Sequence, residues 1–171
     1  MAGSSLRFGI LTVSDRSAAG KRPDASGPAL TEKITSLGWK VTRQAVVPDE
    51  VLKICSILRS WCNSNEVDVL LTTGGTGFSP RDVTPEATLA VVNRLAPGLT
   101  EAMRAAGLLI TPHAMLSRGV AGMCQKTLIV NLPGSPKGAL ENLEVILPVL
   151  PHAVELIRDF PQPEAGHHLS P

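Results

Sequence analysis

The chain has 171 residues, of which 43% are hydrophobic and 18% charged, and its net charge is +1. This balance is typical of one folded domain rather than a disordered segment. A near-neutral chain with 3% aromatic residues lacks the basic surface and the stacking side chains of nucleic-acid binders, so we expect no nucleic-acid partner. It also lacks an apolar run of about 18 residues and a signal-peptide pattern. We therefore predict no transmembrane segment and a cytoplasmic location.

Apolar runs alternate along the chain with segments of helical period, which predicts strands and helices in turn. In chain order they are a strand at 8–13, a helix at 28–38, a strand at 41–47, a helix at 50–63, a strand at 67–73, a helix from 84, a helix from 97 to about 109, a strand at 127–132 and a helix from about 138. Pro28 suits the start of its helix and Gly38 the end. Thr84 is predicted as an N-cap, and Pro148 and Pro151 should break the last helix.

This order of elements predicts an α/β domain with a mostly parallel sheet covered by helices on both faces. We place the domain at residues 1–160 and expect 161–171 to be a flexible tail or the start of a linker. Ligands of such sheets bind beyond the carboxyl ends of the strands. The polar loops that follow the predicted strands lie at 14–15, 48–49, 74–82 and 133–138.

The glycine-rich loop after the third strand is the strongest candidate for a ligand site. Gly74, Gly75 and Gly77 allow a tight turn in which backbone N–H groups approach an anion closely, and Thr76 adds a hydroxyl donor. The loop is neither a Walker A motif nor a dinucleotide fingerprint. A plain turn between strand and helix is the alternative, but a strand before and a helix after the loop favour phosphate binding.

Two aspartates near these loops have competing interpretations. Asp82 would repel phosphates unless a cation bridges them, which makes it a candidate Mg²⁺ ligand. It could equally form an Asx turn or pair with Arg81. Asp49 is spaced as the N-cap of the helix from Glu50, and spacing alone favours that role over one in a site.

The other polar and sulfur-containing side chains carry weaker signals. Ser117 and Arg118 form a candidate phosphate contact, although a lone arginine is usually solvated. The three cysteines are predicted to be reduced thiols, because their number is odd and no C-x-x-C spacing occurs. We expect His113 and His152 to be structural or surface residues, and Met103, Met115 and Met123 to fill the core.

The segment TTGGTGFSPRDVTPEAT at Thr72–Thr88 resembles the signature of the molybdopterin adenylyltransferases, the MogA-like family. Within that family it looks most like the gephyrin G domain and its plant counterpart. Further matching blocks are, in order, GILTVSD (Gly9–Asp15), VVPDE (Val46–Glu50), MLSR (Met115–Arg118), TLIVNLPGSPKG (Thr127–Gly138) and ILPVLPHAVELIRD (Ile146–Asp159). The resemblance spans residues 7–159 and is specific, whereas the GGTG loop alone is shared with tubulin-like GTPases.

The resemblance implies a three-layer α/β/α MogA-like fold, a homotrimer and an enzyme of molybdenum cofactor biosynthesis. The implied reaction joins molybdopterin to AMP from Mg-ATP and releases pyrophosphate, with ATP and molybdopterin as substrates and Mg²⁺ as cofactor. By position, Asp49 and Asp82 match two essential aspartates of the family, with catalytic and metal-binding roles. The residues that would line the nucleotide and pterin pocket are Ser14, Asp15, Gly74, Gly75, Thr76, Gly77, Ser117, Pro133, Gly134 and Ser135.

Four points go beyond the matched blocks. Gly107 stands where relatives carry serine, so a hydroxyl contact to the substrate is expected to be missing. The alternative functions are a non-catalytic trimeric scaffold module of a gephyrin-like protein, against which Asp49 and Asp82 argue, and a generic tubulin-like nucleotide-binding protein. The sequence leaves undecided a scaffolding role beside catalysis. It also leaves undecided whether a molybdenum-insertion domain is fused to this chain or separate.

Overall fold

The structure is a computed structural model that describes residues 5–158. Its elements are β1 (Arg7–Val13), α1 (Asp15–Ala18), α2 (Ser26–Ser36), β2 (Lys40–Val47), α3 (Val51–Asn63), β3 (Val69–Thr73), α4 (Thr84–Leu89), β4 (Arg94–Leu95), α5 (Pro97–Leu108), the 3₁₀ helix η1 (Pro112–Leu116), β5 (Ala121–Cys124), β6 (Thr127–Leu132), α6 (Pro136–Ile146), the 3₁₀ helix η2 (Leu147–Val149) and α7 (Leu150–Arg158). The predicted tail at 161–171 lies outside the described residues, and the domain boundary stays a prediction.

Six strands form one sheet in the order β2-β1-β3-β6-β5-β4. Neighbours among β2, β1, β3 and β6 pair in parallel, whereas β5 and β4 are added antiparallel at one edge. The predicted α/β fold with a mostly parallel sheet is therefore confirmed. Because the four parallel strands point the same way, their carboxyl ends meet at one edge of the molecule.

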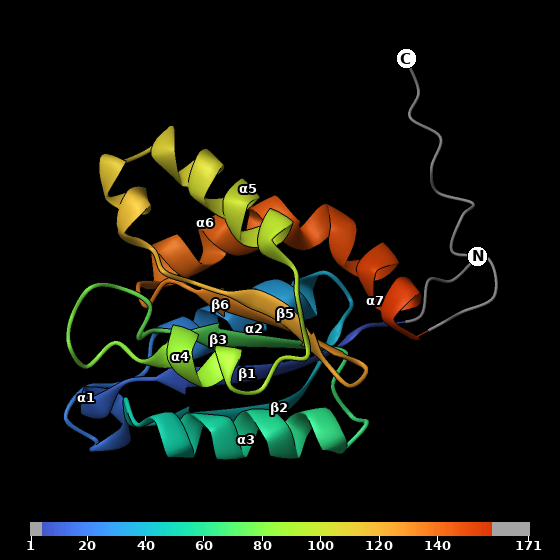
Figure 1. Ribbon diagram of the computed structural model, residues 1–171, viewed down its shortest axis with the longest axis horizontal. Helices are drawn as coiled ribbons and strands as arrows, with labels where there is room; N and C mark the ends of the chain where they lie inside the picture. The colour runs from blue at the N-terminus through green and yellow to red at the C-terminus, as the bar shows by residue number, and fades with distance from the viewer. Residues whose placement is uncertain (1–4, 159–171) are drawn as a thin grey trace.

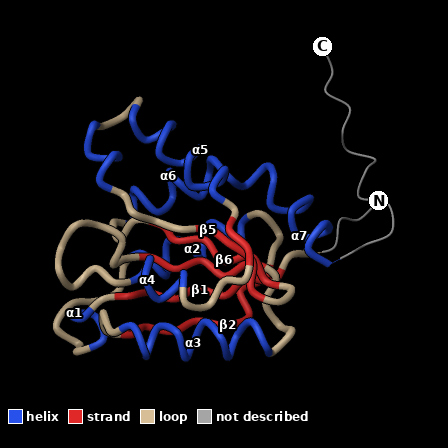
Figure 2. The backbone as a smooth tube through the Cα atoms, in the orientation of Figure 1, coloured by secondary structure: helices blue, strands red, loops and turns tan. Residues whose placement is uncertain are grey.

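Helices cover both faces of the sheet (Figures 1 and 2). Side chains alternate between the faces along each strand. Phe8 and Ile10 of β1 therefore join the core beneath α2, α5, α6 and α7, and Leu11 joins the core beneath α3 and α4. These two apolar layers give the three-layer α/β/α arrangement. No helix within residues 5–158 is long and apolar enough to span a membrane.

Several local predictions were wrong in detail. The helix at 28–38 begins earlier, at Ser26, and the residues before it include the short α1 rather than loop alone. β4 and β5 were missed because one has two residues and the other, Ala121–Cys124, has no β-branched residue. Thr84 is the first residue of α4 rather than its cap, since Val83 takes the N-cap position. The predicted break is confirmed at Pro148, which lies in η2, but not at Pro151, which lies in the first turn of α7.

The cysteine prediction is confirmed: Cys55, Cys62 and Cys124 are all buried free thiols. Burial raises the pKa of the Cys62 thiol, which keeps it protonated and unreactive. Met103 is buried as expected, but Met115 is 63% exposed on η1, so the prediction of a core role for Met115 was wrong.

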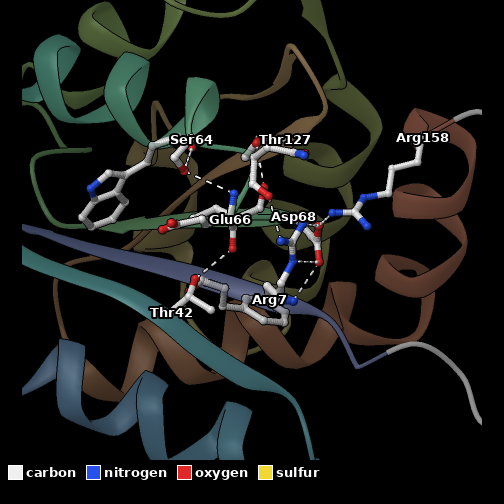
Figure 3. Close-up of polar contacts among 11 residues, drawn as sticks. Arg7, Thr42, Ser64, Glu66, Asp68, Thr127 and Arg158 are labelled. Carbon is white, nitrogen blue, oxygen red and sulfur yellow. Dashed lines mark hydrogen bonds and ion pairs between the residues drawn. The ribbon is translucent and has the colours of Figure 1, made fainter.

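A buried ion network ties α7 to the sheet at the edge opposite the strands' carboxyl ends (Figure 3). Asp68, directly before β3, is 2% exposed. Arg7 donates to its carboxylate from the backbone N at 2.9 Å and from Nη2 at 2.9 Å, and Arg158 of α7 pairs with the same carboxylate. Burial, together with the nearby charge of Arg7, lowers the pKa of Arg158. Two guanidinium groups thus balance one buried carboxylate far from the polar loops.

Candidate functional site

The polar loops that follow β1, β2, β3 and β6 gather at the carboxyl edge of the sheet, on the side where α1 lies in Figure 1. Hydrogen bonds join the loops: Thr73 Oγ1 donates to the Pro133 carbonyl at 2.7 Å, and Ser26 Oγ donates to the Gly134 carbonyl at 2.7 Å. The loop after β6 is therefore fastened both to the end of β3 and to the start of α2. The sheet thus brings together segments that are far apart in the sequence.

Two cavities open at this edge and share a wall. The first, of about 340 Å³, is lined by polar groups that include Ser14, Asp49 and Gly74. The second, of about 760 Å³, lies against α5, η1 and α6 and is lined by residues that include Thr76, Gly77, Ser117 and Pro133. The residues that line both cavities are Gly75, Asp82, Gly134 and Ser135. Two ligands bound in these cavities would meet at this shared wall.

Asp15 and Asp49 hold the ends of β1 and β2 together. The backbone N of Asp15 donates to Asp49 Oδ2 at 2.8 Å, and the backbone N of Asp49 donates to Asp15 Oδ1 at 3.0 Å. Asp49 is therefore not the N-cap of α3, because Glu50 takes that position without a side-chain cap bond. Asp15 is not one of the described residues that line the two cavities. Its carboxylate binds Arg81 and the Asp49 amide instead.

The charge of Asp49 is poorly balanced. Burial raises the pKa of its carboxyl, and the negative charges of Asp15 and Asp82 raise it further, against the lowering effects of the Asp15 amide and Arg81. Arg81 instead makes a two-point contact with Asp15, from Nε at 3.0 Å and Nη2 at 2.9 Å, and holds the pKa of Asp15 below its usual range. A cation that enters the first cavity would relieve the repulsion around Asp49.

The start of the glycine-rich loop requires glycine for its backbone. Gly74 has φ +100°, and a Cβ there would lie 2.2 Å from the Val13 carbonyl oxygen. Gly75 has φ +65°, and its Cβ would lie 2.4 Å from Thr84 Oγ1 and 2.9 Å from Asp49 Oδ1. Thr84 Oγ1 in turn donates to the Gly74 carbonyl at 2.8 Å. The loop therefore turns close to β1 and packs its backbone beside Asp49.

The next part of the loop presents unused donors. Within residues 5–158, the backbone N–H groups of Gly75, Thr76 and Gly77 donate no hydrogen bond. Gly75 faces both cavities, and Thr76 and Gly77 face the second. Consecutive free amides on a glycine-rich loop form a natural anion site. The plain-turn alternative does not explain why three donors remain unpaired beside two cavities.

Asp82 closes this loop at the wall between the cavities. Its Oδ2 accepts from the Ser79 backbone N at 3.0 Å, while its own N donates to the Ser79 carbonyl at 2.9 Å. An Asx turn would bond the carboxylate to the N–H two residues further on, whereas Asp82 bonds back to Ser79, so that alternative was wrong. The pair with Arg81 was also wrong, because Arg81 binds Asp15. One oxygen anchors the turn, while the residue still lines both cavities.

Three serines predicted to line the pocket have local structural bonds as well. Ser14 Oγ caps α1 by accepting from Ser17 N at 3.2 Å, and Ser135 Oγ caps α6 by accepting from Gly138 N at 3.1 Å. Ser117 Oγ accepts from Gly119 N at 3.4 Å. In each bond the serine oxygen is the acceptor. The hydroxyl proton of each serine is thus not used in these bonds.

Sequence reasoning missed several charged residues at the two cavities. Arg22 and Asp24 line the first cavity, and Arg104 and Lys137 line the second. Asp24 could have been found, since its Oδ1 accepts from the N–H groups of two residues at the start of α2, a bond typical of an acidic residue before a helix. The two residues of the second cavity lie on α5 and α6 and carry no local signal.

Gly107 lies in α5 and lines the second cavity, but its backbone does not have the positive φ of a left-handed cap. A Cβ there would lie 2.9 Å from Ala114 Cβ. Glycine at this position therefore permits close packing of η1 against α5. The serine that relatives carry at this position gave no sign of this packing role.

Comparisons with known proteins agree with this geometry. The family model described as a probable molybdopterin binding domain matches residues 9–152. The chain is 41% identical over 154 residues to a molybdopterin adenylyltransferase of Helicobacter pylori, covering 89% of this chain and 88% of the relative. It is 45% identical over 164 residues to gephyrin of Dictyostelium discoideum, covering 90% of this chain. It spans only about a quarter of gephyrin's length, since the match covers 23% of that protein.

Solved structures show the same relationship. The crystal structure of the molybdopterin biosynthesis enzyme MoaB from Thermus thermophilus superposes with a TM-score of 0.85 at 51% identity, covering 91% of this chain and 98% of that one. The predicted MogA-like fold is thereby confirmed. The matched family model covers most of the domain, including all four loops of the site. The chain is similar to MogA, to MoaB and to a part of gephyrin. It belongs to the family of probable molybdopterin binding domains.

Proposed function

We propose that this chain adenylylates molybdopterin with ATP, a step of molybdenum cofactor biosynthesis. The observation that carries the proposal is the pair of cavities that share Gly75, Asp82, Gly134 and Ser135, because a transfer between two substrates needs two sites that meet. The relatives named molybdopterin adenylyltransferase support the same reaction. A generic tubulin-like function is not needed to explain any feature of the site.

The reaction forms one bond and breaks one. An oxygen of the terminal phosphate of molybdopterin attacks the α-phosphorus of ATP, and the bond from that phosphorus to the bridging oxygen of the β-phosphate breaks, which releases pyrophosphate. Such a transfer depends on positioning and on neutralising charge rather than on a covalent nucleophile. The unpaired amides of Gly75, Thr76 and Gly77 are suited to stabilise phosphate oxygens during the transfer.

The residues present also fit Mg²⁺, which the family resemblance implies. Mg²⁺ is usually bound by one or two carboxylates together with substrate phosphates, and Asp49 and Asp82 provide two carboxylates at the first cavity. Residues 5–158 contain no group of three or more metal-binding side chains, which favours an ion that arrives with ATP. When bound, Mg²⁺ would neutralise phosphate charge, and Asp49 and Asp82 would hold it.

We propose further that the protein is a homotrimer, as the resemblance implies. Support comes from exposed apolar side chains at the end of α5 and on η1, where Leu109 is 90%, Ile110 58% and Met115 63% exposed. Exposed apolar clusters often mark interfaces. Light scattering should give three times the 18.0 kDa chain mass, and Leu109→Glu should lower it. A monomer mass for the parent at micromolar concentrations would reject the trimer.

The wider setting of the reaction is also proposed rather than established. A molybdenum-insertion domain, fused to this chain or separate, would receive the adenylylated pterin. The relationship with gephyrin is compatible with such a fused domain. The cytoplasmic location and a scaffolding role stay predictions.

The experiment for the main proposal is direct. The full chain is incubated with molybdopterin and Mg-ATP, and products are separated and weighed by mass spectrometry. We expect adenylylated molybdopterin from the parent and from Arg43→Ala, which serves as a surface control. Arg43 lies away from the site, and its Nε donates to the Glu66 carboxylate over a distance of 2.8 Å. Asp82→Asn should give almost none. Absence of product from the parent would overturn the proposal.

A further inference from the structure

Arg118 contacts the loop that carries Asp82 at several points. Its Nε donates to the Gly77 carbonyl at 2.8 Å, and its Nη2 donates to the Asp82 carbonyl at 2.7 Å. Its backbone N donates to the Thr76 carbonyl at 2.9 Å, and Nη1 pairs with Glu86 of α4. One side chain thus bridges both ends of the 77–82 segment and fixes them to α4.

This arrangement differs from an ordinary surface ion pair. The side chain of Arg118 is 35% exposed, and two of its three donor nitrogens bind carbonyls rather than the carboxylate of Glu86. The planar guanidinium presents its donors in a fixed fork, so it sets the spacing between Gly77 and Asp82. A lysine would provide a single point charge and could not hold both carbonyls in this geometry.

The segment that Arg118 holds contains the parts of the site that most need exact placement. The free amides of Gly75, Thr76 and Gly77 lie at its start, and Asp82 lies at its end, on the wall between the cavities. Residues 77–82 have a second side-chain anchor, the two-point pair of Arg81 with Asp15 in the loop after β1. That pair is more exposed, with the Arg81 side chain at 60% and the Arg118 side chain at 35%, and it holds the segment at Arg81 alone. Arg118 is the anchor that contacts both Gly77 and Asp82.

We propose that Arg118 is a positioning residue for nucleotidyl transfer, which acts by fixing the distance between the amides of the glycine-rich loop and the carboxylate of Asp82. This inference rests on the proposed function. The sequence indicated only a weak candidate phosphate contact at Ser117 and Arg118. The structure instead shows the Arg118 guanidinium bound to the protein's own loop. Its contribution is geometric, and charge at this position is not sufficient.

The test compares Arg118→Ala and Arg118→Lys with the parent and with Arg43→Ala. Hydrogen exchange without ligand should be faster in both Arg118 variants at the amides of Ser79 and Asp82, which are bonded within the loop. Turnover should fall by about 100-fold in both, since small misplacements at a reacting centre have effects of that size. The effect should be mainly on kcat, with a smaller change in KM for molybdopterin.

Chemical rescue separates positioning from a merely structural role. Millimolar guanidinium, well below denaturing concentration, should restore at least part of the turnover of Arg118→Ala and slow its loop exchange, but should leave the parent and Arg43→Ala unchanged. Normal turnover of Arg118→Lys, or unaltered loop exchange in both variants, would overturn the inference. If the parent makes no adenylylated pterin, the proposed function fails, whereas the exchange rates of the variants, with and without guanidinium, still decide whether Arg118 fixes the loop.

Discussion

Asp15 and Asp49 are joined by reciprocal hydrogen bonds in which the backbone N–H of each residue donates to the carboxylate of the other, at 2.8 Å and 3.0 Å. Each residue lies two positions after the end of one of two adjacent parallel strands, so the bonds fix the relative position of the β1 and β2 loops. Asp15 is further neutralised by Arg81, whereas Asp49 faces the first cavity. Of this pair, Asp49 is therefore the carboxylate that is available to a bound cation.

Asp49→Asn should abolish most transfer without destabilising the protein at neutral pH. Because the pKa of Asp49 is raised in the folded state, its contribution to stability is fully present below the pKa of the unfolded chain and is lost as pH rises through the folded value. Asparagine avoids that loss. Thermal melts in a chelator should show the variant equal to or above the parent at pH 7, with the difference shrinking in acid. The prediction is contradicted if the melting temperature of the variant, measured against that of the parent, is lower at pH 7 than in acid.

Asp82→Asn should nearly eliminate AMP transfer while the melting temperature changes little. The amide oxygen can still accept from Ser79 N, as Oδ2 does in the parent, so the turn is kept while the charge is removed. Single-turnover assays and thermal melts measure the two properties separately. Near-normal turnover by the folded variant would remove Asp82 from the mechanism.

Gly75→Ala should weaken both the fold and ATP binding, because its Cβ would lie 2.4 Å from Thr84 Oγ1. The matched control is Gly20→Ala, since Gly20 has a similar φ of +69° but nothing within 4 Å of the added Cβ. Positive φ alone should destabilise each variant by about 1–3 kcal/mol. Denaturation and nucleotide titration should show an additional loss only for Gly75→Ala, and equal results for both variants would mean that the contact is unimportant.

Gly107→Ser should destabilise the protein by about 1–3 kcal/mol, as overpacking does. The added Cβ would lie 2.9 Å from Ala114 Cβ. The double variant Gly107→Ser with Ala114→Gly removes the clash and tests whether the hydroxyl strengthens pterin binding. A single variant that melts later than the parent would show that η1 moves aside without loss.

Asp68→Ala should lower stability by about 3–5 kcal/mol, because it leaves two partly buried guanidinium groups without their carboxylate. Asp68 lies at the opposite edge from the site, so transfer per folded molecule should match the parent at low temperature. Urea denaturation gives the first quantity and an activity assay normalised to folded protein gives the second. A specific loss of turnover would connect the two ends of the sheet.

The parallel strands and their loops were predictable because β1, β3 and β6 are short apolar runs and β2 alternates between apolar and polar residues. Each is followed within two residues by glycine, proline or aspartate. β6 was predicted at its observed bounds, Thr127–Leu132. The antiparallel strands β4 and β5 were not predictable, since they depend on pairing, β5 with β6 and β4 with β5, rather than on their own residues. Local signals therefore locate the four parallel strands but not the antiparallel edge.

The same limit applies to the site. Spacing alone favoured Asp49 as a helix cap. Only the position of Asp15, at the start of α1 just after the neighbouring strand β1, shows why the Asp49 carboxylate binds there instead. Arg118 lies 36 residues from Asp82 in the sequence, so its contact with the loop leaves no local pattern. Residues whose role comes from tertiary contacts need the structure to be found.

The central claim is tested most directly by following labelled phosphorus. The full chain is given molybdopterin with ATP labelled at either the α- or the γ-phosphate, and label is measured in the pterin product and in pyrophosphate. Adenylyl transfer predicts that α-label appears in the pterin and γ-label only in pyrophosphate, in equal molar amounts. Transfer of γ-label to the pterin, or release of pyrophosphate without labelled pterin, would contradict the account.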